Sequence, residues 1–492
     1  MDHDEATRQA DREIAGKRDR IRSSPYRLHY HFMAPAGWMN DPNGLVFYKG
    51  EHHLFYQHNP YDSCWGPMHW GHATSRDLVR WEHQPVALAP SEPYDRGPSP
   101  SHGCFSGSAV VDGEELALIY TGHVEGKEPM QVQCLATGRG GVRFAKYAGN
   151  PVIGDVPEEG SRDFRDPKVW RHGDRWYMVV GTSKEGRGKV LLYASPDLRK
   201  WDYQGVAFES DGTQGVMWEC PDLFPLGGSH VFLVSPVSDV PGKPLYWVGD
   251  MDYETGVFEP KLGSTLDYGF DFYAPQTWLD DKGRRLLIGW MQRWSDPIPS
   301  QPHGWAGALT IPRELVLEDG VLKQKPAAEL AMLRSNPARL DPLAVEQPIA
   351  VAELAGQATE TLIELNVRET AASVFGIRVA CSEDGEERTE IRLDLRKNEL
   401  TLDRERSGRG AKGVCQAPFA IDSKGRVTLH LFLDASSIEL FVNDGEQVVT
   451  GRIYPAAGSN RFSLFALGGK ACIDRIETWK LESVWEEDRN GS

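Results

Sequence analysis

Short apolar segments separated by turns recur through the first two thirds of the chain. Five segments follow one plan, in which a polar opening precedes an apolar run, a turn containing Gly or Asp, and a second apolar run. These segments begin at Asn40, Phe105, Phe164, Glu219 and Tyr273. Apolar runs of this length, bounded by such turns, are typical of β-hairpins. The pattern therefore predicts five consecutive hairpins.

The hairpins belong to larger units with a nearly constant spacing. A third apolar strand follows each hairpin, and in the fifth unit we expect it at residues 307–313. The units recur after 65, 60, 56 and 52 residues when one anchor per unit is compared, the anchors being Asp41, Ser106, Asp166, Asp222 and Ala274. Four short strands per unit at this spacing are typical of propeller blades. An ordinary sandwich or barrel would show hairpins without a fixed period, so we predict a five-bladed β-propeller.

The pattern changes in the last third of the chain. Residues 325–342 predict a short helix and then a linker flanked by prolines. Beyond it, apolar and polar residues alternate between Val427 and Leu433, as in strands of a separate β-sandwich. The predicted fold class is all-β, a five-bladed β-propeller followed by a C-terminal β-sandwich. The predicted parts are a polar helical extension at 1–24, the propeller at 25–335, a linker at 336–345 and the sandwich at 346–485.

Composition and charge exclude several classes of protein. Hydrophobic residues make up 40% of the 492 residues and charged residues 25%, which is typical of a folded globular chain. The net charge of −17 argues against a nucleic acid or an anionic membrane as partner. No apolar stretch approaches the roughly 18 residues of a membrane span, and the N-terminus lacks a secretory signal. We therefore expect a cytoplasmic protein, of open oligomeric state, that acts on a small molecule.

Cysteine and histidine patterns indicate neither a metal nor a cofactor. The seven cysteines form no CxxC pair, and the fifteen histidines include no HExxH motif. We find no Walker-A phosphate loop and no GxGxxG dinucleotide fingerprint. The sequence therefore predicts no metal and no cofactor, and any chemistry falls to side chains alone.

Three carboxylates occupy matching places in the repeats. The first strand of each propeller blade lines the central axis, so Asp41, Asp166 and Glu219 are expected to meet at one mouth of it. Glycoside hydrolysis uses two such groups, one as general acid and one as nucleophile or base. The alternative is that Asp41 and Asp166 are turn residues, because each precedes a proline. Their recurrence at matching positions favours a catalytic function.

Aromatic residues near the predicted strand mouths fit a sugar site, because aromatic rings cover the apolar faces of sugars. The candidates are Trp38, Trp65, Trp70, Phe105, Trp218 and Trp305. Any single tryptophan of this set is more often a core residue than a ligand. Gln57 is equally well explained as an ordinary strand residue, and Cys220 as a small buried one.

Four motifs in chain order resemble the signature blocks of glycoside hydrolase family 32. They are WMNDPNG at 38–44, FSGS at 105–108, RDPK at 165–168 and ECPD at 219–222. The similarity extends over residues 27–480 and is greatest to intracellular bacterial sucrose hydrolases. That family contains invertases, inulinases, levanases and sucrose-6-phosphate hydrolases.

The resemblance implies a role for each matching residue. Asp41 would be the nucleophile and Glu219 the general acid and then the base. Asp166 would stabilise the transition state, and we expect the neighbouring Arg165 to keep it ionised. The residues implied to line the fructose pocket are Asn40, Gln57, Trp65, Phe105, Ser106, Arg165, Tyr273 and Trp305.

The predicted activity is that of a retaining β-fructofuranosidase, which hydrolyses sucrose through a covalent fructosyl-enzyme intermediate. A retaining enzyme requires the Asp41 and Glu219 carboxyls to lie about 5–5.5 Å apart. Sucrose 6-phosphate and fructo-oligosaccharides are alternative substrates. The net negative charge disfavours a phosphorylated sugar unless a local pair of Arg or Lys overrides it. A non-catalytic sugar-binding propeller would be expected to lack one of the three acids.

Overall fold

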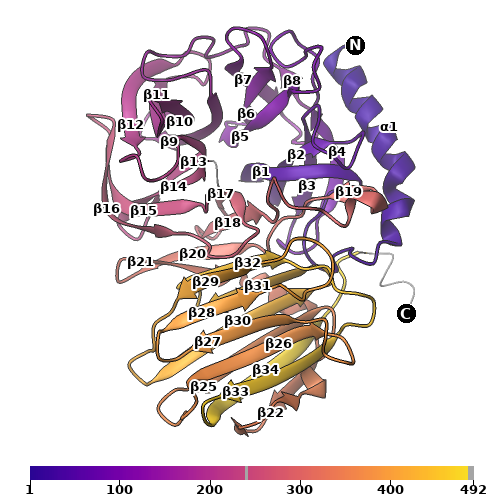
Figure 1. Cartoon of the computed structure of the whole chain (residues 1–492). Helices are drawn as coiled ribbons and strands as arrows, with labels where there is room; N and C mark the ends of the chain where they lie inside the picture. Colours follow the sequence, from indigo (N-terminus) through magenta and orange to yellow (C-terminus); the bar gives the residue numbers. More distant parts are fainter. Residues whose placement is uncertain (239–241, 486–492) are drawn as a thin grey trace.

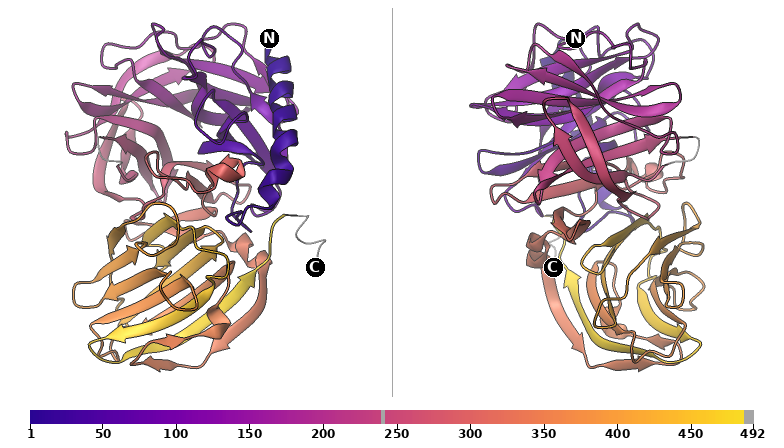
Figure 2. Two further views of the ribbon diagram at one scale, coloured as in Figure 1. Left: turned by 45° about the vertical axis from the view of Figure 1, so that its right-hand side comes forward. Right: turned by 90° about the vertical axis from the view of Figure 1, so that its left-hand side faces the viewer.

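The computed structural model describes residues 1–238 and 242–485, and within them β-sheet forms two domains. Five sheets surround a central axis in the first domain, and two larger sheets face each other in the second (Figure 1). The predicted five-bladed propeller followed by a sandwich is confirmed. Side views show the sandwich packed against one side of the propeller rim (Figure 2).

Each blade is an antiparallel sheet whose strands follow one another in the chain. Blade 1 comprises β1 (Gly37–Tyr48), β2 (Glu51–Asn59), β3 (His69–Ser75) and β4 (Glu82–Leu88). Blade 2 comprises β5 (His102–Asp112), β6 (Glu115–Val124), β7 (Gln131–Gly138) and β8 (Ala145–Lys146). Blade 3 comprises β9 (Phe164–His172), β10 (Arg175–Lys184), β11 (Arg187–Ser195) and β12 (Asp202–Glu209). Blade 4 comprises β13 (Met217–Leu226), β14 (Ser229–Val237), β15 (Leu245–Asp252) and β16 (Val257–Thr265).

The fifth blade differs from the prediction in its third strand. It comprises β17 (Tyr273–Leu279), β18 (Arg285–Trp290), β20 (Arg313–Glu318) and β21 (Val321–Pro326), so most of 307–313 precedes the third strand. The preceding strand β19 (Trp305–Ala306) instead pairs in parallel with β1 of blade 1 and closes the ring. Gly307 permits this approach, because a Cβ there would lie 2.0 Å from the carbonyl oxygen of Met39.

The innermost strands β1, β5, β9, β13 and β17 pack side by side around the axis. Each contains a β-bulge, where its pairing with the next strand is interrupted. The bulges lie at Asp41, Ser106, Asp166, Cys220 and Ala274. Bulges re-aim side chains, so these positions point away from the regular strand direction. The fourth anchor is therefore Cys220, not Asp222 as expected, and the spacing becomes 65, 60, 54 and 54 residues.

The backbone at three of these bulges is left-handed. Asp166, Cys220 and Ala274 have φ values of 66°, 48° and 48°, and each precedes a proline. Non-glycine residues adopt this conformation at a cost that the surrounding structure must offset. The amide N–H groups are satisfied locally, since that of Asp166 donates to the Thr121 hydroxyl and that of Ala274 to the Ser235 hydroxyl.

The sandwich buries an apolar core between its two sheets. One sheet contains β22 (Arg334–Leu340), β34 (Ala471–Leu481), β25 (Thr359–Asn366), β30 (Arg426–Asp434), β31 (Ser437–Val442) and β32 (Gln447–Arg452), with β23 (Leu343–Val345) also on β34. The other contains β24 (Ile349–Ala350), β33 (Arg461–Leu467), β26 (Val374–Cys381), β27 (Thr389–Asp394), β28 (Glu399–Asp403) and β29 (Val414–Pro418). Single 3-10 turns occupy Gln301–His303, Ala328–Leu333 and Ala352–Leu354.

The segment 336–345 forms strands, whereas the sequence predicts an irregular linker there. Strands β22 and β23 cover most of this segment and pair with β34. Pro337 misled the prediction, but it lies at a register shift between Ser335 and Ala338, where a missing N–H is tolerated. The other domain boundaries stay a proposal.

Helix α1 (His3–Arg22) lies along blade 1 beside β4 (Figure 1). The Asp2 carboxylate accepts a hydrogen bond from the Glu5 amide and caps its start. Ala6, Ala10 and Ile21 are its buried apolar residues, so the helix is otherwise polar. It covers the outer strand of the blade, where backbone groups would otherwise lack partners.

A buried ionic cluster joins the two domains. We call His31, Arg313, Asp434 and Glu439 the junction cluster. The His31 ring lies between the Asp434 and Glu439 carboxylates, with N–O distances of 2.8 and 2.9 Å. Arg313 Nη2 lies 2.5 Å from the other Glu439 oxygen. All four side chains are inaccessible to solvent, so each charge depends on its partners.

Candidate active site

A pocket of about 340 Å³ opens at one mouth of the propeller axis. The bulges of the inner strands supply its floor, because they turn side chains from four blades toward the same point. Nine of the residues expected at the site line this pocket: Asn40, Asp41, Gln57, Trp65, Phe105, Ser106, Arg165, Asp166 and Glu219. The three carboxylates therefore lie together, although they are far apart in the sequence.

Asp41 is partly buried and held by two neutral donors. Its Oδ2 accepts a hydrogen bond of 2.7 Å from the Ser106 hydroxyl, and its Oδ1 accepts one of 3.1 Å from the Asn40 amide. Trp38 Nε1 donates to Asn40 at 2.8 Å and thereby fixes that amide. Burial raises the pKa of Asp41 to about 6, against the Ser106 hydrogen bond, and the charge of Glu219 adds to the rise.

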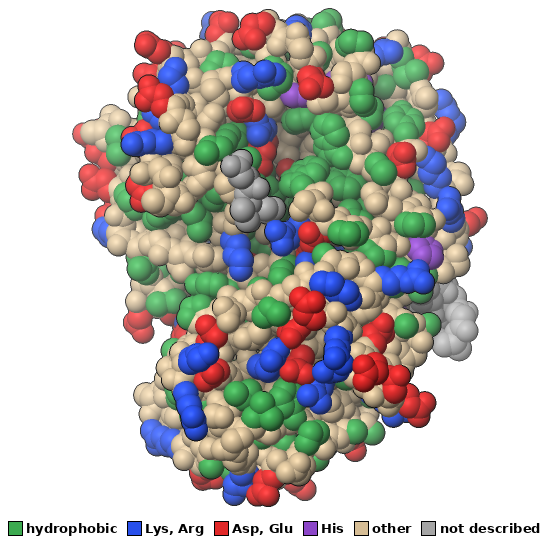
Figure 3. Space-filling model, in the orientation of Figure 1, with side chains coloured by type: hydrophobic (Ala, Val, Ile, Leu, Met, Phe, Trp, Pro, Cys, Tyr) green, Lys and Arg blue, Asp and Glu red, His purple; other side chains and the backbone are tan. Residues whose placement is uncertain are grey.

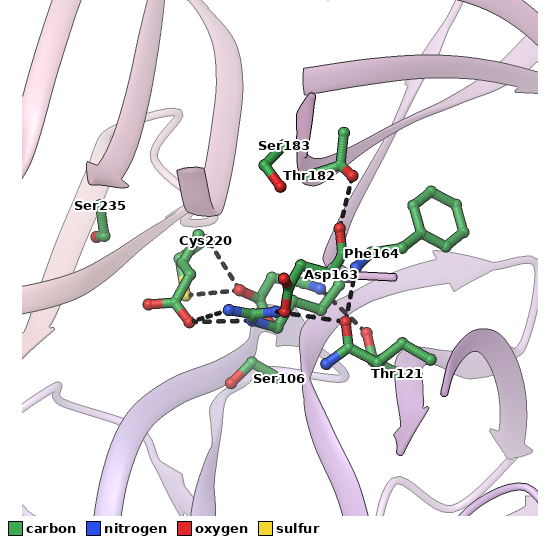
Figure 4. Close-up of polar contacts among 12 residues, drawn as sticks. Ser106, Thr121, Asp163, Phe164, Thr182, Ser183, Cys220 and Ser235 are labelled. Atoms are coloured by element: carbon green, nitrogen blue, oxygen red, sulfur yellow. Dashed lines mark hydrogen bonds and ion pairs between the residues drawn. The ribbon is translucent and has the colours of Figure 1, made fainter. Parts of the chain in front are cut away.

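Asp166 contacts Cys220, whose place beside Ser106 and Asp163 is seen in Figure 4. Its Oδ2 accepts a hydrogen bond of 2.9 Å from the Cys220 amide and lies 3.6 Å from the Cys220 sulfur. The same sulfur lies 3.7 Å from Asp41 Oδ2, so one thiol touches both carboxylates. Burial, followed by repulsion from Glu219, raises the pKa of Asp166 to about 7.

Glu219 is held at both carboxyl oxygens. Its Oε1 accepts hydrogen bonds of 3.0 and 2.8 Å from Nε and Nη2 of Arg165, and its Oε2 accepts one of 2.6 Å from the Tyr273 hydroxyl. Arg165 also donates to Asp163 at 2.9 Å and to Gln131 at 3.3 Å. These partners fix the direction in which the Glu219 carboxyl enters the pocket.

The expected action of Arg165 on Asp166 is wrong. The guanidinium is committed to Glu219 and Asp163, and it only partly offsets the effects that raise the pKa of Asp166. The net effect is a pKa of about 7 for Asp166, raised first by burial and then by the charge of Glu219.

Trp305 lies outside the pocket, in contrast to its expected place. Its side chain is 1% exposed, and its Nε1 donates to the Ser24 hydroxyl at 3.1 Å. The Arg452 guanidinium lies 5.6 Å from the ring centre on the sandwich side. Pairing of β19 with β1 directs this indole into the interior, and no substrate could reach it.

The other predicted binding residues face the pocket in different ways. Phe105 stacks on His123 with ring centres 4.1 Å apart, and Trp65 meets Phe105 edge-on at 6.1 Å. Gln57 is almost fully buried and donates to the Cys104 carbonyl at 2.9 Å. Tyr273 does not line the pocket itself and acts on it through its hydroxyl.

Six lining residues were not anticipated from the sequence, namely Ser101, His123, Met130, Gln131, Asp163 and Trp294. Gln131 and Gln133 alternate with apolar residues at the start of β7, and glutamines in such an apolar run were a usable signal. Trp294 follows the last residue of β18 in an irregular segment, so no periodic pattern indicated it.

A larger cavity of about 750 Å³ adjoins the pocket, and we call it the chamber. Glu219 and Trp294 line both cavities. Residues 414–416 of β29 complete the chamber, so the sandwich contributes to its wall. The front face of the molecule is hollowed above the boundary between the two domains (Figure 3).

No group of three or more His, Cys, Asp or Glu side chains could hold a metal ion among residues 1–238 and 242–485. Across the same residues, no helix has both the length and the apolar composition needed to span a membrane.

Comparisons with known proteins agree with this geometry. Residues 31–326 match the N-terminal domain of glycosyl hydrolases family 32, and residues 329–480 match the C-terminal domain of that family. A sucrose-6-phosphate hydrolase of Escherichia coli is 39% identical over 94% of this chain and 96% of its own. A raffinose invertase of the same species is 40% identical over 92% and 94%. A β-fructofuranosidase of Bombyx mori has a TM-score of 0.85 at 38% identity, over 98% of this chain and 99% of its own.

Proposed function

The chain belongs to glycosyl hydrolase family 32 and hydrolyses sucrose-type fructosides, and from this premise we propose that it is a retaining β-fructofuranosidase acting on sucrose. The observation that carries the proposal is the meeting of Asp41 and Glu219 in one pocket with different partners. Asp41 has neutral donors, whereas Glu219 has a guanidinium and a phenol. Two carboxyls held so differently suit two different roles.

Asp41 is the nucleophile in this proposal. With its pKa at about 6 it is mostly ionised at neutral pH, and its burial leaves the carboxylate poorly solvated. Ser106 and Asn40 hold one oxygen each and so orient the carboxylate toward the anomeric C2 of a bound fructosyl unit. Attack at C2 forms the fructosyl ester and breaks the bond to the glucosyl oxygen.

Glu219 is the general acid and then the base. It gives a proton to the glucosyl oxygen as that oxygen leaves, and it later takes a proton from the water that cleaves the ester. Asp166 can share this proton with Glu219, because burial and repulsion from Glu219 raise the pKa of Asp166 to about 7. Arg165 and Tyr273 keep the Glu219 carboxyl at the boundary between pocket and chamber.

Asp166 binds hydroxyl groups of the fructosyl ring in this scheme. Its Oδ2 is occupied by the Cys220 amide, so the other oxygen is the one available to the substrate. A carboxyl with a pKa of about 7 can donate or accept a hydrogen bond, which suits a hydroxyl whose charge changes along the reaction. The proposed substrate is a small molecule, and a cytoplasmic location stays a prediction.

The stereochemical outcome tests the mechanism. Turnover of sucrose in aqueous methanol should give methyl β-fructofuranoside, which does not mutarotate and can be identified by NMR. The α-anomer would show inversion and overturn the retaining assignment. In Glu219→Gln protein with an activated fructoside, mass spectrometry should detect the ester as the mass of one fructosyl unit on the Asp41 peptide.

Sucrose 6-phosphate is a second candidate, and one observation favours it. The chamber beside Glu219 contains both a lysine and an arginine. The sequence expectation of sucrose rested on the overall charge of −17, which says nothing about a local pair of cations. Fructo-oligosaccharides remain a further alternative on cavity size alone.

A further inference from the structure

The left-handed bulges of blades 3, 4 and 5 share a feature that the proposed reaction does not use. Two positions after each of them stands a buried polar side chain: Lys168 after Asp166, Asp222 after Cys220 and Gln276 after Ala274. The strands that carry these side chains are neighbours, with β13 between β9 and β17 (Figure 1). A layer of polar side chains therefore lies behind the bulges, further from the mouth of the axis.

One ion pair joins these three strands. Lys168 Nζ lies 2.8 Å from Asp222 Oδ2. The same ammonium donates hydrogen bonds of 3.0 Å to Gln276 Oε1 and of 2.6 Å to the Thr277 carbonyl. Asp222 Oδ2 also accepts hydrogen bonds of 2.8 Å from both the amide and the hydroxyl of Thr277. These contacts run between blades 3, 4 and 5 and not along one sheet, and we call the four residues the axial cluster.

Stability alone does not explain the axial cluster. Asp222 is 0% exposed, and within residues 1–238 and 242–485 its Oδ1 has no hydrogen-bond partner. Burial lowers the pKa of Lys168, the Asp222 charge opposes that effect, and Arg285 is a second cation near the pair. Apolar side chains of similar volume are often as stabilising as a buried ion pair. The charged pair adds direction, because each of its hydrogen bonds holds a strand at one height along the axis.

The strands that the ion pair joins carry most of the charged groups of the site. Arg165 and Asp166 belong to β9, and Glu219 and Cys220 belong to β13. The Cys220 amide donates to Asp166 Oδ2 at 2.9 Å, so this contact crosses between the strands. Arg165 Nη2 donates to Glu219 Oε1 at 2.8 Å and crosses in the same way. Both contacts depend on the relative height of β9 and β13, and a displacement of about 1 Å can cost about 10²-fold in rate.

We propose that Lys168 and Asp222 are positioning residues, whose ion pair fixes β9 against β13 and so holds Asp166 and Glu219 in their reactive arrangement. The proposal rests on the proposed function, because it assigns those two carboxyls to the reaction. Neither Lys168 nor Asp222 lines the pocket or the chamber, so the pair acts through the bulges and does not touch the substrate. We therefore expect its effect in kcat and not in KM.

The test compares two buried Lys–Asp pairs. Lys146 contacts Asp95 in blade 2, with side chains 5% and 0% exposed, and this pair is the matched control outside the axial cluster. Lys168→Met should lower kcat for sucrose by about 10–100-fold and change KM by less than about threefold. Lys146→Met should keep kcat within about twofold, although both variants leave a buried aspartate unpaired and should lower the urea midpoint. A kcat within about threefold of the wild type in Lys168→Met, or equal losses in the two variants, would overturn the proposal.

The double variant Lys168→Met with Asp222→Asn separates positioning from stability, and it keeps the proposal testable if Lys168→Met does not fold. Because both charges are removed together, the urea midpoint should recover toward that of the wild type. The directional contacts stay lost, so kcat should remain at least about tenfold below that of the wild type. Recovery of kcat together with the midpoint would leave the pair a structural role only and contradict the proposal.

A titration of Asp166 adds a readout that needs no turnover. The groups that act on its carboxyl are Asp41, Arg165, Glu219 and Cys220, and the Cys220 amide lowers its pKa. If β9 moves against β13 in the double variant, that hydrogen bond weakens, and the pKa of Asp166 should rise by at least about 0.5 pH unit. Carboxyl-carbon NMR of aspartate-labelled protein, with Asp166→Asn to assign the signal, should show this rise and none in Lys146→Met. An unchanged titration would contradict the positioning role, whereas absence of turnover of any fructoside by the wild type would overturn the proposed function.

Discussion

Two groups of buried carboxylates in this chain differ in their acid–base behaviour. In the pocket, burial raises the pKa of Asp41 to about 6 and that of Asp166 to about 7. In the junction cluster, burial acts in the same direction, yet hydrogen bonds and nearby positive charge leave the pKa values of Asp434 and Glu439 below their usual range. Burial raises the pKa of the carboxyls in both groups, so burial alone does not explain the difference.

The difference lies in the number and kind of donors. Asp434 accepts hydrogen bonds from the His29, Tyr30 and Ala435 amides and contacts the His29 and His31 rings. The pocket holds four carboxylates around one guanidinium, which is bound to Glu219 and Asp163. Carboxylates with several hydrogen-bond donors and cations stay ionised and stabilise a fold. Carboxylates with few such partners have raised pKa values and are suited to reaction. We therefore expect substitutions in the pocket to affect turnover and substitutions at the junction to affect stability.

The largest expected effect is the loss of turnover in Asp41→Asn. Without the nucleophile, kcat for sucrose should fall by about 10⁴–10⁶-fold. The free energy of unfolding of this variant should rise. A folded pKa of about 6 against an ordinary 3.8 means that the stabilisation from Asp41 is complete below about pH 3.8 and lost as the pH rises through 6.

At pH 7 the Asp41 charge therefore destabilises the fold, and Asn removes it. We expect a gain of about 1–3 kcal/mol in the free energy of unfolding, measured by urea denaturation. A lower free energy of unfolding in Asp41→Asn would show that the ionised Asp41 stabilises the fold, as the carboxylates of the junction cluster do.

Glu219→Gln should lower kcat for sucrose by roughly 10²–10⁴-fold. The loss should be much smaller with β-fructosyl fluoride, whose leaving group needs no proton. Both rates come from the same assay of released fructose. Equal losses on the two substrates would remove Glu219 from the acid role.

At the junction, Asp434→Asn should lower the free energy of unfolding by about 3–5 kcal/mol, because it leaves the buried His31 with one carboxylate and removes acceptors from several donors. The remaining folded protein should keep its kcat/KM, measured well below the unfolding transition. A loss of stability under about 1 kcal/mol would contradict the comparison.

His31→Gln gives a smaller loss and a pH dependence. The Asp434 and Glu439 contacts raise the pKa of His31 despite its burial, so its contribution is full below pH 6.5 and disappears as the pH rises through the raised value. The wild type should thus lose stability on the alkaline side of neutrality. In the variant this dependence should flatten, with a loss of about 1–3 kcal/mol at pH 6. Urea midpoints of both proteins should be measured from pH 6 to 9. If His31 were neutral in the wild type, the midpoints would depend on pH in the same way in both proteins.

The smallest effect is expected for Ser106→Ala. Its hydroxyl lowers the pKa of Asp41, so its removal should move the acidic limb of kcat/KM upward by about 0.5–1 pH unit. Ser108→Ala, which removes a hydroxyl bonded to the Pro167 carbonyl in the same strand, is the matched control and should leave the limb in place. If the acidic limb of kcat/KM does not move in Ser106→Ala, it reports the titration of a group other than Asp41.

The sequence indicated the propeller and the three carboxylates because both repeat with the blades. Asp41 and Asp166 stand at equivalent bulges, and a motif of polar residue, proline and apolar run is visible without coordinates. Contacts between units were not visible in this way. The partner of Arg165 depends on which way a bulge turns its side chain, and the burial of Trp305 depends on a strand that pairs with blade 1.

The chamber also could not be predicted from the sequence. Its wall combines the end of blade 4, the segment after β18 and β29 of the sandwich. No local pattern relates Arg293 to Lys243 or to residues 414–416, because their proximity arises only when the two domains pack. The polar helix at the N-terminus, by contrast, was evident from composition, and α1 occupies that segment.

The five bulges have a consequence for how such a protein can acquire new chemistry. Each innermost strand has one bulge at the matching place in its blade, and the residue there is Asp in two blades and Ser, Cys and Ala in the others. An engineer who wants a different reactive group at the mouth need not redesign a loop, since the backbone slot is already built. Ser106 is the position to use first, because it lines the pocket beside Asp41, whereas Ala274 is fully buried and lines neither cavity. Protein evolution could diversify the centre in the same way, by exchanging single side chains while the ring stays intact.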